Sequence, residues 1–134
     1  MKILWQSNAG WSTSGYGVQT GIFTPPLAAA GHEVTIASYY GLQGAPLIKD
    51  GIRVLPPLAD AYLNDIIESH MLDTAAEALI TLMDIWVLNP QIYGNLPWCA
   101  WVPVDSEPML PQTLTALRSA KWIWAMSRWA EDLI

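Results

Sequence analysis

The chain has 134 residues, of which 52% are hydrophobic and 13% are charged, and its formal net charge is −6. This composition predicts one well-buried domain rather than a disordered segment. The six basic residues are scattered along the sequence, so it lacks the basic stripe that binding to nucleic acid or an anionic membrane requires.

The cysteine count and the N-terminal pattern argue against a secreted, metal-binding or membrane-spanning protein. Cys99 is the single cysteine and lies in an apolar run, so we interpret it as a small buried hydrophobe. No group of histidine, cysteine and acidic residues has metal-ligand spacing, and we predict no metal site. Lys2 leads directly into strand-type residues without a signal-peptide pattern, and no apolar stretch reaches the length of a membrane span. We therefore expect a cytoplasmic protein without a transmembrane segment.

The first 36 residues predict half of a βαβ unit. A strand over Lys2–Gln6 enters a polar loop containing glycines, which can take positive φ and approach a bound group closely. A helix over Gly17–Ala30 follows, ended by Gly31, and a second strand covers Glu33–Tyr39. The free N–H groups at the start of this helix would favour an anion or a sugar hydroxyl.

Two prolines fall inside this first predicted helix. Pro25 and Pro26 each remove a backbone donor, and Thr24 is pushed away from helical geometry. We expect a kink or a restart of the helix there.

The remaining sequence alternates strand and helix patterns. The expected strands, most of them continuous apolar runs typical of a sheet buried on both faces, cover Ile52–Leu55, Ala78–Asp84, Trp98–Val104 and Trp122–Ala125. The expected helices cover Ala61–Ala76, Gln112–Ala120 and a segment that opens after the N-cap residue Ser127. The connection from Tyr40 to Gly51 is too short for a crossover helix, so Ile52–Leu55 is expected at a sheet edge. The pattern predicts a single α/β domain over residues 1–134, with a doubly wound, mostly parallel, Rossmann-like sheet in three α/β/α layers.

Five segments, in this order along the chain, carry a family resemblance: KILWQSN leading into SGYGVQT, AAAGHEVTIAS, ALITLMDIWVL, PWCAWVPVDSEPM and SAKWIWAMSRWAEDLI. Together they resemble the N-terminal Rossmann-like domain of a GT-B glycosyltransferase of family four, the glycosyl transferase group 1 type. The resemblance covers essentially the whole chain.

This resemblance implies an enzymatic activity and a separate role for each of two domains. In such enzymes the N-terminal domain mainly holds the acceptor, and a C-terminal domain binds the nucleotide-sugar from which a hexose is transferred, without an obligatory metal. The donor-domain signature, two glutamates separated by seven residues, does not occur in this chain. We therefore expect no cofactor here, a nucleotide-sugar only with a missing second domain, and little activity from the chain alone.

Two acidic residues are the main candidates for chemistry. Asp84 and Asp105 follow two strands whose carboxyl ends should meet at one edge of the sheet, where open α/β sheets bind ligands. Converging carboxylates can orient an acceptor hydroxyl or remove its proton. The resemblance favours Asp105 as the catalytic residue. The alternatives are an Asx turn at Asp105 and backbone or arginine pairing at Asp84.

The first loop supplies further candidates for acceptor or phosphate binding. The backbone N–H groups of Gly15 and Gly17 could contact a ligand, or the glycines could simply permit a tight turn. Tyr16 stands where many relatives have a glycine, and it narrows the loop.

Three polar residues complete the candidate set. Asn8 and Ser14 could bind a sugar hydroxyl, or they could cap the helix or close a turn. Arg128 follows the last strand and could reach an anionic ligand, or it could be an ordinary solvated arginine.

Two other functions remain open. A dinucleotide-binding domain would need G-x-G-x-x-G, whereas Gly15, Gly17 and Gly21 are spaced one residue too long, and Ser38-Tyr39-Tyr40 offers no acid at the end of the second strand. A non-enzymatic half-domain could instead form a homodimer through an exposed apolar face.

Overall fold

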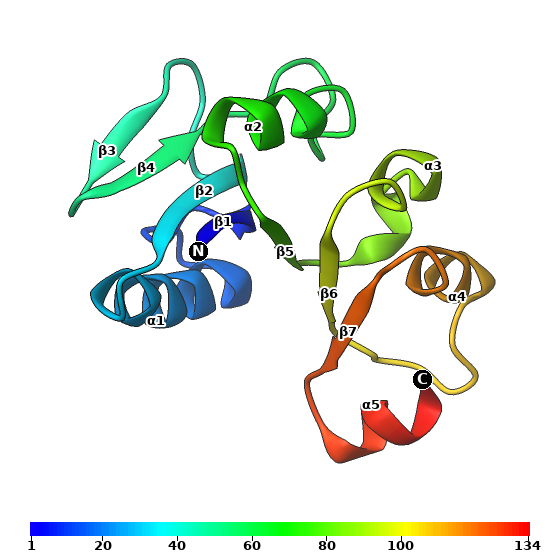
Figure 1. The fold of residues 1–134 in the computed structure, drawn as a ribbon. Coiled ribbons are helices and arrows are strands. Elements are labelled where there is room, and N and C mark those ends of the chain that lie inside the picture. The colour runs from blue at the N-terminus through cyan, green and yellow to red at the C-terminus, as the bar shows by residue number, and fades with distance from the viewer.

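The computed structural model describes residues 1–134, which form one seven-stranded sheet flanked by helices (Figure 1). The strands are β1 (Lys2–Asn8), β2 (Glu33–Tyr40), β3 (Leu47–Lys49), β4 (Ile52–Leu55), β5 (Ala78–Leu82), β6 (Trp98–Val102) and β7 (Trp122–Ala125). The helices are α1 (Gly15–Ala29), α2 (Ile67–Thr74), α3 (Pro90–Tyr93), α4 (Pro111–Leu117) and α5 (Arg128–Leu133), with a 3₁₀ turn η1 (Ile85–Val87).

The strand order confirms the predicted doubly wound sheet. It is β3-β4-β2-β1-β5-β6-β7, and every neighbouring pair is parallel except β3 with β4. Without the antiparallel β3, this is the order of a Rossmann-like fold, in which the direction of winding reverses between β1 and β5. A crevice for ligands is expected outside the carboxyl ends of the strands at that reversal.

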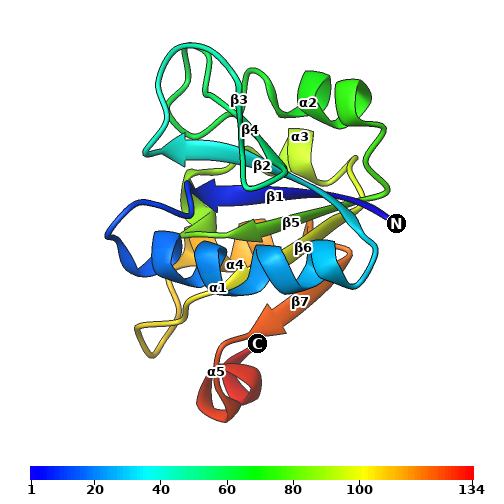
Figure 2. The same cartoon turned by 90° about the vertical axis from the view of Figure 1, so that its left-hand side faces the viewer.

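Helices cover the two faces of the sheet unequally. Figure 2 shows α1 in front of the sheet, with α2, α3 and α4 behind it. Side chains alternate along each strand, so β6 sends Trp98 to the rear face and Cys99 to the front face. The rear core holds 16 buried residues and the front core 10. Cys99 is 4% exposed, which confirms its interpretation as a buried hydrophobe.

Of the two outcomes expected at the prolines, the restart is wrong, because α1 is one helix that continues through Pro25 and Pro26; the kink stays a prediction. Both prolines are exposed, as are Gly21 and Ile22, whose carbonyls lose their usual helical donors. Both carbonyls are therefore at the protein surface, where solvent can hydrogen-bond to them. Gly31, with φ of 94°, ends the helix as predicted.

The predicted helix over Ala61–Ala76 begins only at Ile67. Two aspartates organise the preceding segment as turns: Asp60 accepts from the backbone N–H of Tyr62 at 2.6 Å, and Asp65 accepts from the N–H of Asp60 at 2.9 Å. Leu63 adopts φ of 69°, which no helix accommodates.

Two smaller predictions also need correction. The sheet edge is formed by β3, which pairs with β4, so Ile52–Leu55 is an inner strand. The helix α4 ends three residues before the expected Ala120. The N-cap prediction is confirmed, since the Ser127 hydroxyl accepts from the Ala130 N–H at 3.1 Å.

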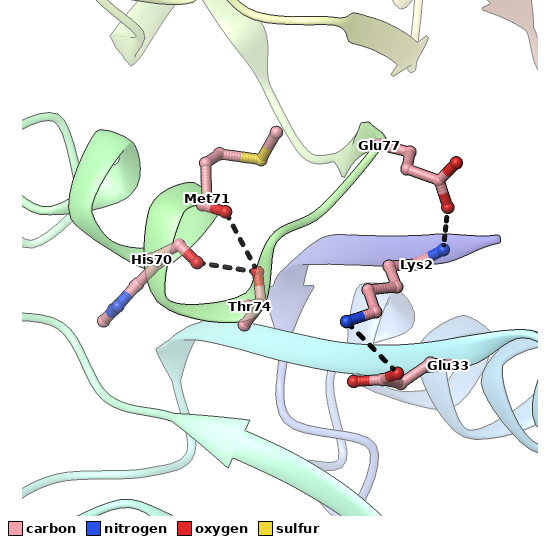
Figure 3. A network of polar contacts seen from close by, with 6 residues as sticks. All are labelled: Lys2, Glu33, His70, Met71, Thr74 and Glu77. Atoms are coloured by element: carbon pink, nitrogen blue, oxygen red, sulfur yellow. Dashed lines mark hydrogen bonds and ion pairs between the residues drawn. The ribbon is translucent and has the colours of Figure 1, made fainter.

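Polar contacts fasten the amino-terminal edge of the sheet (Figure 3). The backbone N–H of Lys2 donates to the Glu77 carboxylate at 2.7 Å, and the Lys2 ammonium lies 3.9 Å from Glu33. In the last turn of α2, the Thr74 hydroxyl donates to the carbonyl of His70 at 2.7 Å.

No helix in the structure is long and apolar enough to cross a membrane.

Candidate ligand site at the carboxyl edge of the sheet

The turns that follow β1, β5 and β6 lie at one edge of the sheet, as the sequence predicts. Parallel pairing of β1 with β5, and of β5 with β6, requires this arrangement. Asn8 is the last residue of β1, Asp84 follows β5 and Asp105 follows β6.

The β1–α1 loop is held by hydrogen bonds within the protein. The Ser14 hydroxyl is the N-cap of α1: it accepts from the Gly17 N–H at 3.1 Å and also from the Asn8 side-chain amide. The Ala9 N–H donates to the Tyr40 carbonyl at 2.8 Å, which joins the loop to the end of β2. Of the two roles predicted for Ser14, the structure shows the capping one.

Gly10 and Gly17 serve close packing, and neither they nor Gly15 adopt unusual backbone angles. Gly10, Gly15 and Gly17 are not among the residues with positive φ. A Cβ atom on Gly17 would lie 2.5 Å from the Ser12 carbonyl oxygen, so this position excludes every side chain. A Cβ atom on Gly15 would meet nothing within 4 Å, which leaves the backbone there open to its surroundings.

Tyr16 lies near both candidate carboxylates, Asp84 and Asp105. Burial, and then the nearby Asp84 carboxylate, raise the pKa of the Tyr16 phenol, and Asp105 adds a smaller contribution. Burial and Asp84 likewise raise the pKa of Tyr39 to about 12. Both phenols therefore stay neutral at physiological pH, and each can donate one hydrogen bond and accept others.

A hollow of about 530 Å³ opens beside this cluster, at the ends of β1 and β2. We call it the tyrosine hollow, because three tyrosines contribute to a lining made of Asn8, Thr13, Ser14, Tyr39, Tyr40, Ala61 and Tyr62. Tyr39 connects the hollow with Asp84. Its ring centre lies 5.8 Å from that of Tyr62, and the Asp84 carboxylate is close enough to raise the pKa of its phenol. A smaller cavity of about 40 Å³ has both Asp84 and Asp105 in its wall.

A buried glutamine fixes the position of Tyr62. Gln6 is fully buried and donates from its side-chain nitrogen to the Tyr62 carbonyl at 2.9 Å. Its oxygen accepts from the Tyr93 hydroxyl, also at 2.9 Å. The segment before α2 is therefore tied to the sheet through polar contacts in the rear core.

One polar atom at the hollow has no partner. The side chain of Asn8 is 4% exposed, and its Oδ1 accepts no hydrogen bond from the protein. Buried acceptors are normally satisfied, so this oxygen keeps the capacity to accept one further hydrogen bond.

Arg128 lies apart from the other candidates. It begins α5 and lines a separate hollow of about 520 Å³ with residues of β7 and α5. The structure thus brings Asn8, Ser14 and Tyr16 near Asp84 and Asp105, while Arg128 lines neither the tyrosine hollow nor the cavity beside it.

Sequence reasoning missed the aromatic part of the site. Tyr39 and Tyr40 end β2 at the same edge as Asn8, and their position alone could have marked them. Tyr62 gave no such signal, because it fell inside a predicted helix.

No group of three or more histidine, cysteine, aspartate or glutamate side chains is arranged to hold a metal ion. The site offers carboxylates, phenols, an amide and hydroxyls, which are suited to binding hydroxyl groups and moving a proton.

Neither a protein-family model nor a curated protein matches the sequence, so the resemblance to GT-B enzymes rests on the order of the motifs.

Proposed function

We propose that this chain is the acceptor-holding half of a hexosyltransferase. A sugar-bearing or other small acceptor would bind at the carboxyl edge of the sheet, and a second domain would bind the nucleotide-sugar. The observation that carries the proposal is the meeting of Asp84, Asp105 and Tyr16 beside the tyrosine hollow, at the strand ends where α/β sheets bind ligands. The order of the five motifs supplies the sugar chemistry.

The geometry suggests a role for each side chain. Asp105 is exposed and carries an acceptor oxygen that can take the proton of a bound hydroxyl. As that O–H bond breaks, the hydroxyl oxygen bonds to the anomeric carbon, and the nucleoside diphosphate leaves with the electrons of its own bond. Asp84 and the neutral Tyr16 phenol would orient the attacking hydroxyl.

A titration followed residue by residue tests this function. The ¹⁵N-labelled chain is titrated with free sugars and simple glycosides, and binding should shift the signals of Tyr16, Tyr40, Tyr62 and Asp84. Shifts confined to other surfaces, or none with any sugar, would contradict the proposal. A parallel titration with NADH tests the dinucleotide alternative, which the strand order favours but the tyrosines at the end of β2 do not.

Turnover requires the donor domain, so the catalytic assignment is tested in a protein that contains both halves. Asp105→Asn should lower kcat by about 100-fold or more, the usual contribution of a positioned base. Asp132→Asn removes the same charge from an exposed position in α5 and should leave kcat unchanged.

One observation favours a second candidate, self-association of the half-domain. The front face carries an apolar groove of about 670 Å³, in which eleven of the twelve lining residues are hydrophobic, among them Trp101, Trp122 and Trp124. A second copy could cover this groove. Light scattering at increasing concentration tests the idea, and a monomer at the highest concentration would remove it.

A further inference from the structure

No lysine or arginine side chain lines the tyrosine hollow, and the positive charge in its wall is the partial charge at the N-terminus of α1, where Ser14 is the N-cap. The lysines and arginines of the chain are Lys2, Lys49, Arg53, Arg118, Lys121 and Arg128, and none lines this hollow or the small cavity beside it. The exposed Asp84 carboxylate lies near Tyr39 in the wall of the hollow, and the exposed Asp105 shares the small cavity with Asp84. A phosphate or carboxylate bound here would meet like charge without an arginine or lysine to pair with.

The unpartnered oxygen of Asn8 points to the same ligand chemistry independently. Its amide nitrogen is already engaged with Ser14, so the part of the side chain that lacks a partner is an acceptor. Only a group that carries hydrogen, such as a hydroxyl or an ammonium, satisfies it.

The aromatic lining suits a ring-shaped ligand. Tyr40 is 61% exposed and Tyr62 is 40% exposed, so both present ring surface to solvent at the mouth of the hollow. An amphipathic ring can pack on the apolar carbons of a sugar while its hydroxyl remains hydrogen-bonded. A volume of about 530 Å³ lies in the range of small-molecule sites.

We propose that the tyrosine hollow binds a saccharide ring that carries hydroxyl or protonated amino groups and that bears no phosphate or carboxylate. This inference rests on the proposed function, because it specifies the acceptor of that same site. It excludes sugar phosphates and uronic acids from the position nearest Asp84 and Asp105.

Three probes with one common ring test the charge preference: glucose, 6-amino-6-deoxyglucose and glucose 6-phosphate. Each is titrated into the labelled chain at low salt and again at high salt. The amino sugar should bind about fivefold more tightly than glucose at low salt, and the phosphate should bind more weakly than glucose. High salt should bring the three affinities together, since it screens exposed carboxylates.

Variants connect the preference to named residues. The double variant Asp84→Asn with Asp105→Asn should bind glucose and the amino sugar with equal affinity, whereas Asp132→Asn should keep the preference for the amino sugar. Tyr40→Ala, at an exposed position, should weaken all three probes together.

The outcomes separate this inference from the function on which it rests. If glucose 6-phosphate binds the hollow as tightly as glucose at low salt, the charge inference is overturned and sugar binding stands. If the amino preference survives the double variant, the two carboxylates are not its source and the inference fails. If no probe shifts the signals of the hollow, both proposals fall.

Discussion

The two faces of the sheet are built from the same strands and differ in what covers them. On the rear face, α2, α3 and α4 close over a core in which Trp98 is completely buried. On the front face α1 is the covering helix, and Trp122 and Trp124 remain 53% and 48% exposed. Tryptophans on the neighbouring strands β6 and β7 therefore have opposite environments.

The connections of the chain explain this difference. The segments that join β5 to β6 and β6 to β7 carry α3 and α4, which pack against the rear core. No connection returns over the front of β6 and β7, where Trp101 contacts Phe23 and Trp124 edge to face. The aromatic side chains of β6 and β7 and Phe23 of α1 therefore cover one another at this part of the face.

The difference between the two faces is tested most directly by truncating one tryptophan on each face. Trp98→Ala removes a buried indole that packs on Tyr93 and donates to Thr81 at 2.8 Å, and it should cost about 3–5 kcal/mol. Trp122→Ala should cost less than about 1 kcal/mol, because half of its surface already meets water. Urea unfolding of both variants measures the difference, and equal losses would refute it.

The attachment of α1 to the front face can be tested with two glycines of its first turn. Gly17→Ala should destabilise the domain by about 1–3 kcal/mol, since the new methyl group would overlap the Ser12 and Ala9 carbonyl oxygens. Gly15→Ala is the matched control, because its methyl group meets open space and the unfolded chain loses freedom. Thermal unfolding should place Gly15→Ala at or above the parent and Gly17→Ala below it; the reverse order would show that the loop rearranges freely.

A subtler change sharpens the account of the rear face. Tyr93→Phe keeps the ring but leaves the Gln6 oxygen without its donor, and should cost about 1–2 kcal/mol. Because Gln6 also holds the Tyr62 carbonyl, the same variant should shift amide signals of the segment before α2. Unchanged signals there would show that this segment is held by other contacts.

The smallest effect concerns pH and the helix α2 on the rear face. Burial lowers the pKa of His70 below its ordinary 6.5, although its Nε2 lies 3.2 Å from the Pro56 carbonyl. The unfolded chain therefore takes up this proton first as pH falls, and stability declines on acidification below about pH 6.5. His70→Gln should flatten the change in Tm between pH 7 and pH 5. An identical slope in both proteins would assign the decline to other groups.

The sequence predicts the sheet well, because long apolar runs separated by polar turns have few alternatives. The strands at Lys2–Gln6 and Trp98–Val104 are of this kind, and the parallel pairing of each with β5 places Asn8 and Asp105 at one edge of the sheet. The candidate residues on strand ends were accordingly found, although what they bind stays a prediction.

Features set by local polar contacts were not predictable in the same way. A helical pattern over Ala61–Ile66 loses to turns around Asp60 and Asp65, which compete for the same backbone donors. The site residue Tyr62 was hidden by that competition. Arg128 follows the outermost strand β7, so it lies at the end of the sheet away from the reversal of winding, and its role in binding an anion stays a prediction.

The link between the first loop and the end of β2 has a consequence for binding. Ala9 donates to Tyr40, and the Trp11 indole donates to the Gly41 carbonyl at 2.7 Å, so the two segments that border the hollow are joined before any ligand arrives. An incoming molecule would find its contacts preorganised and would lose little free energy to ordering the protein. Association should therefore occur in a single step, without a slow closing phase.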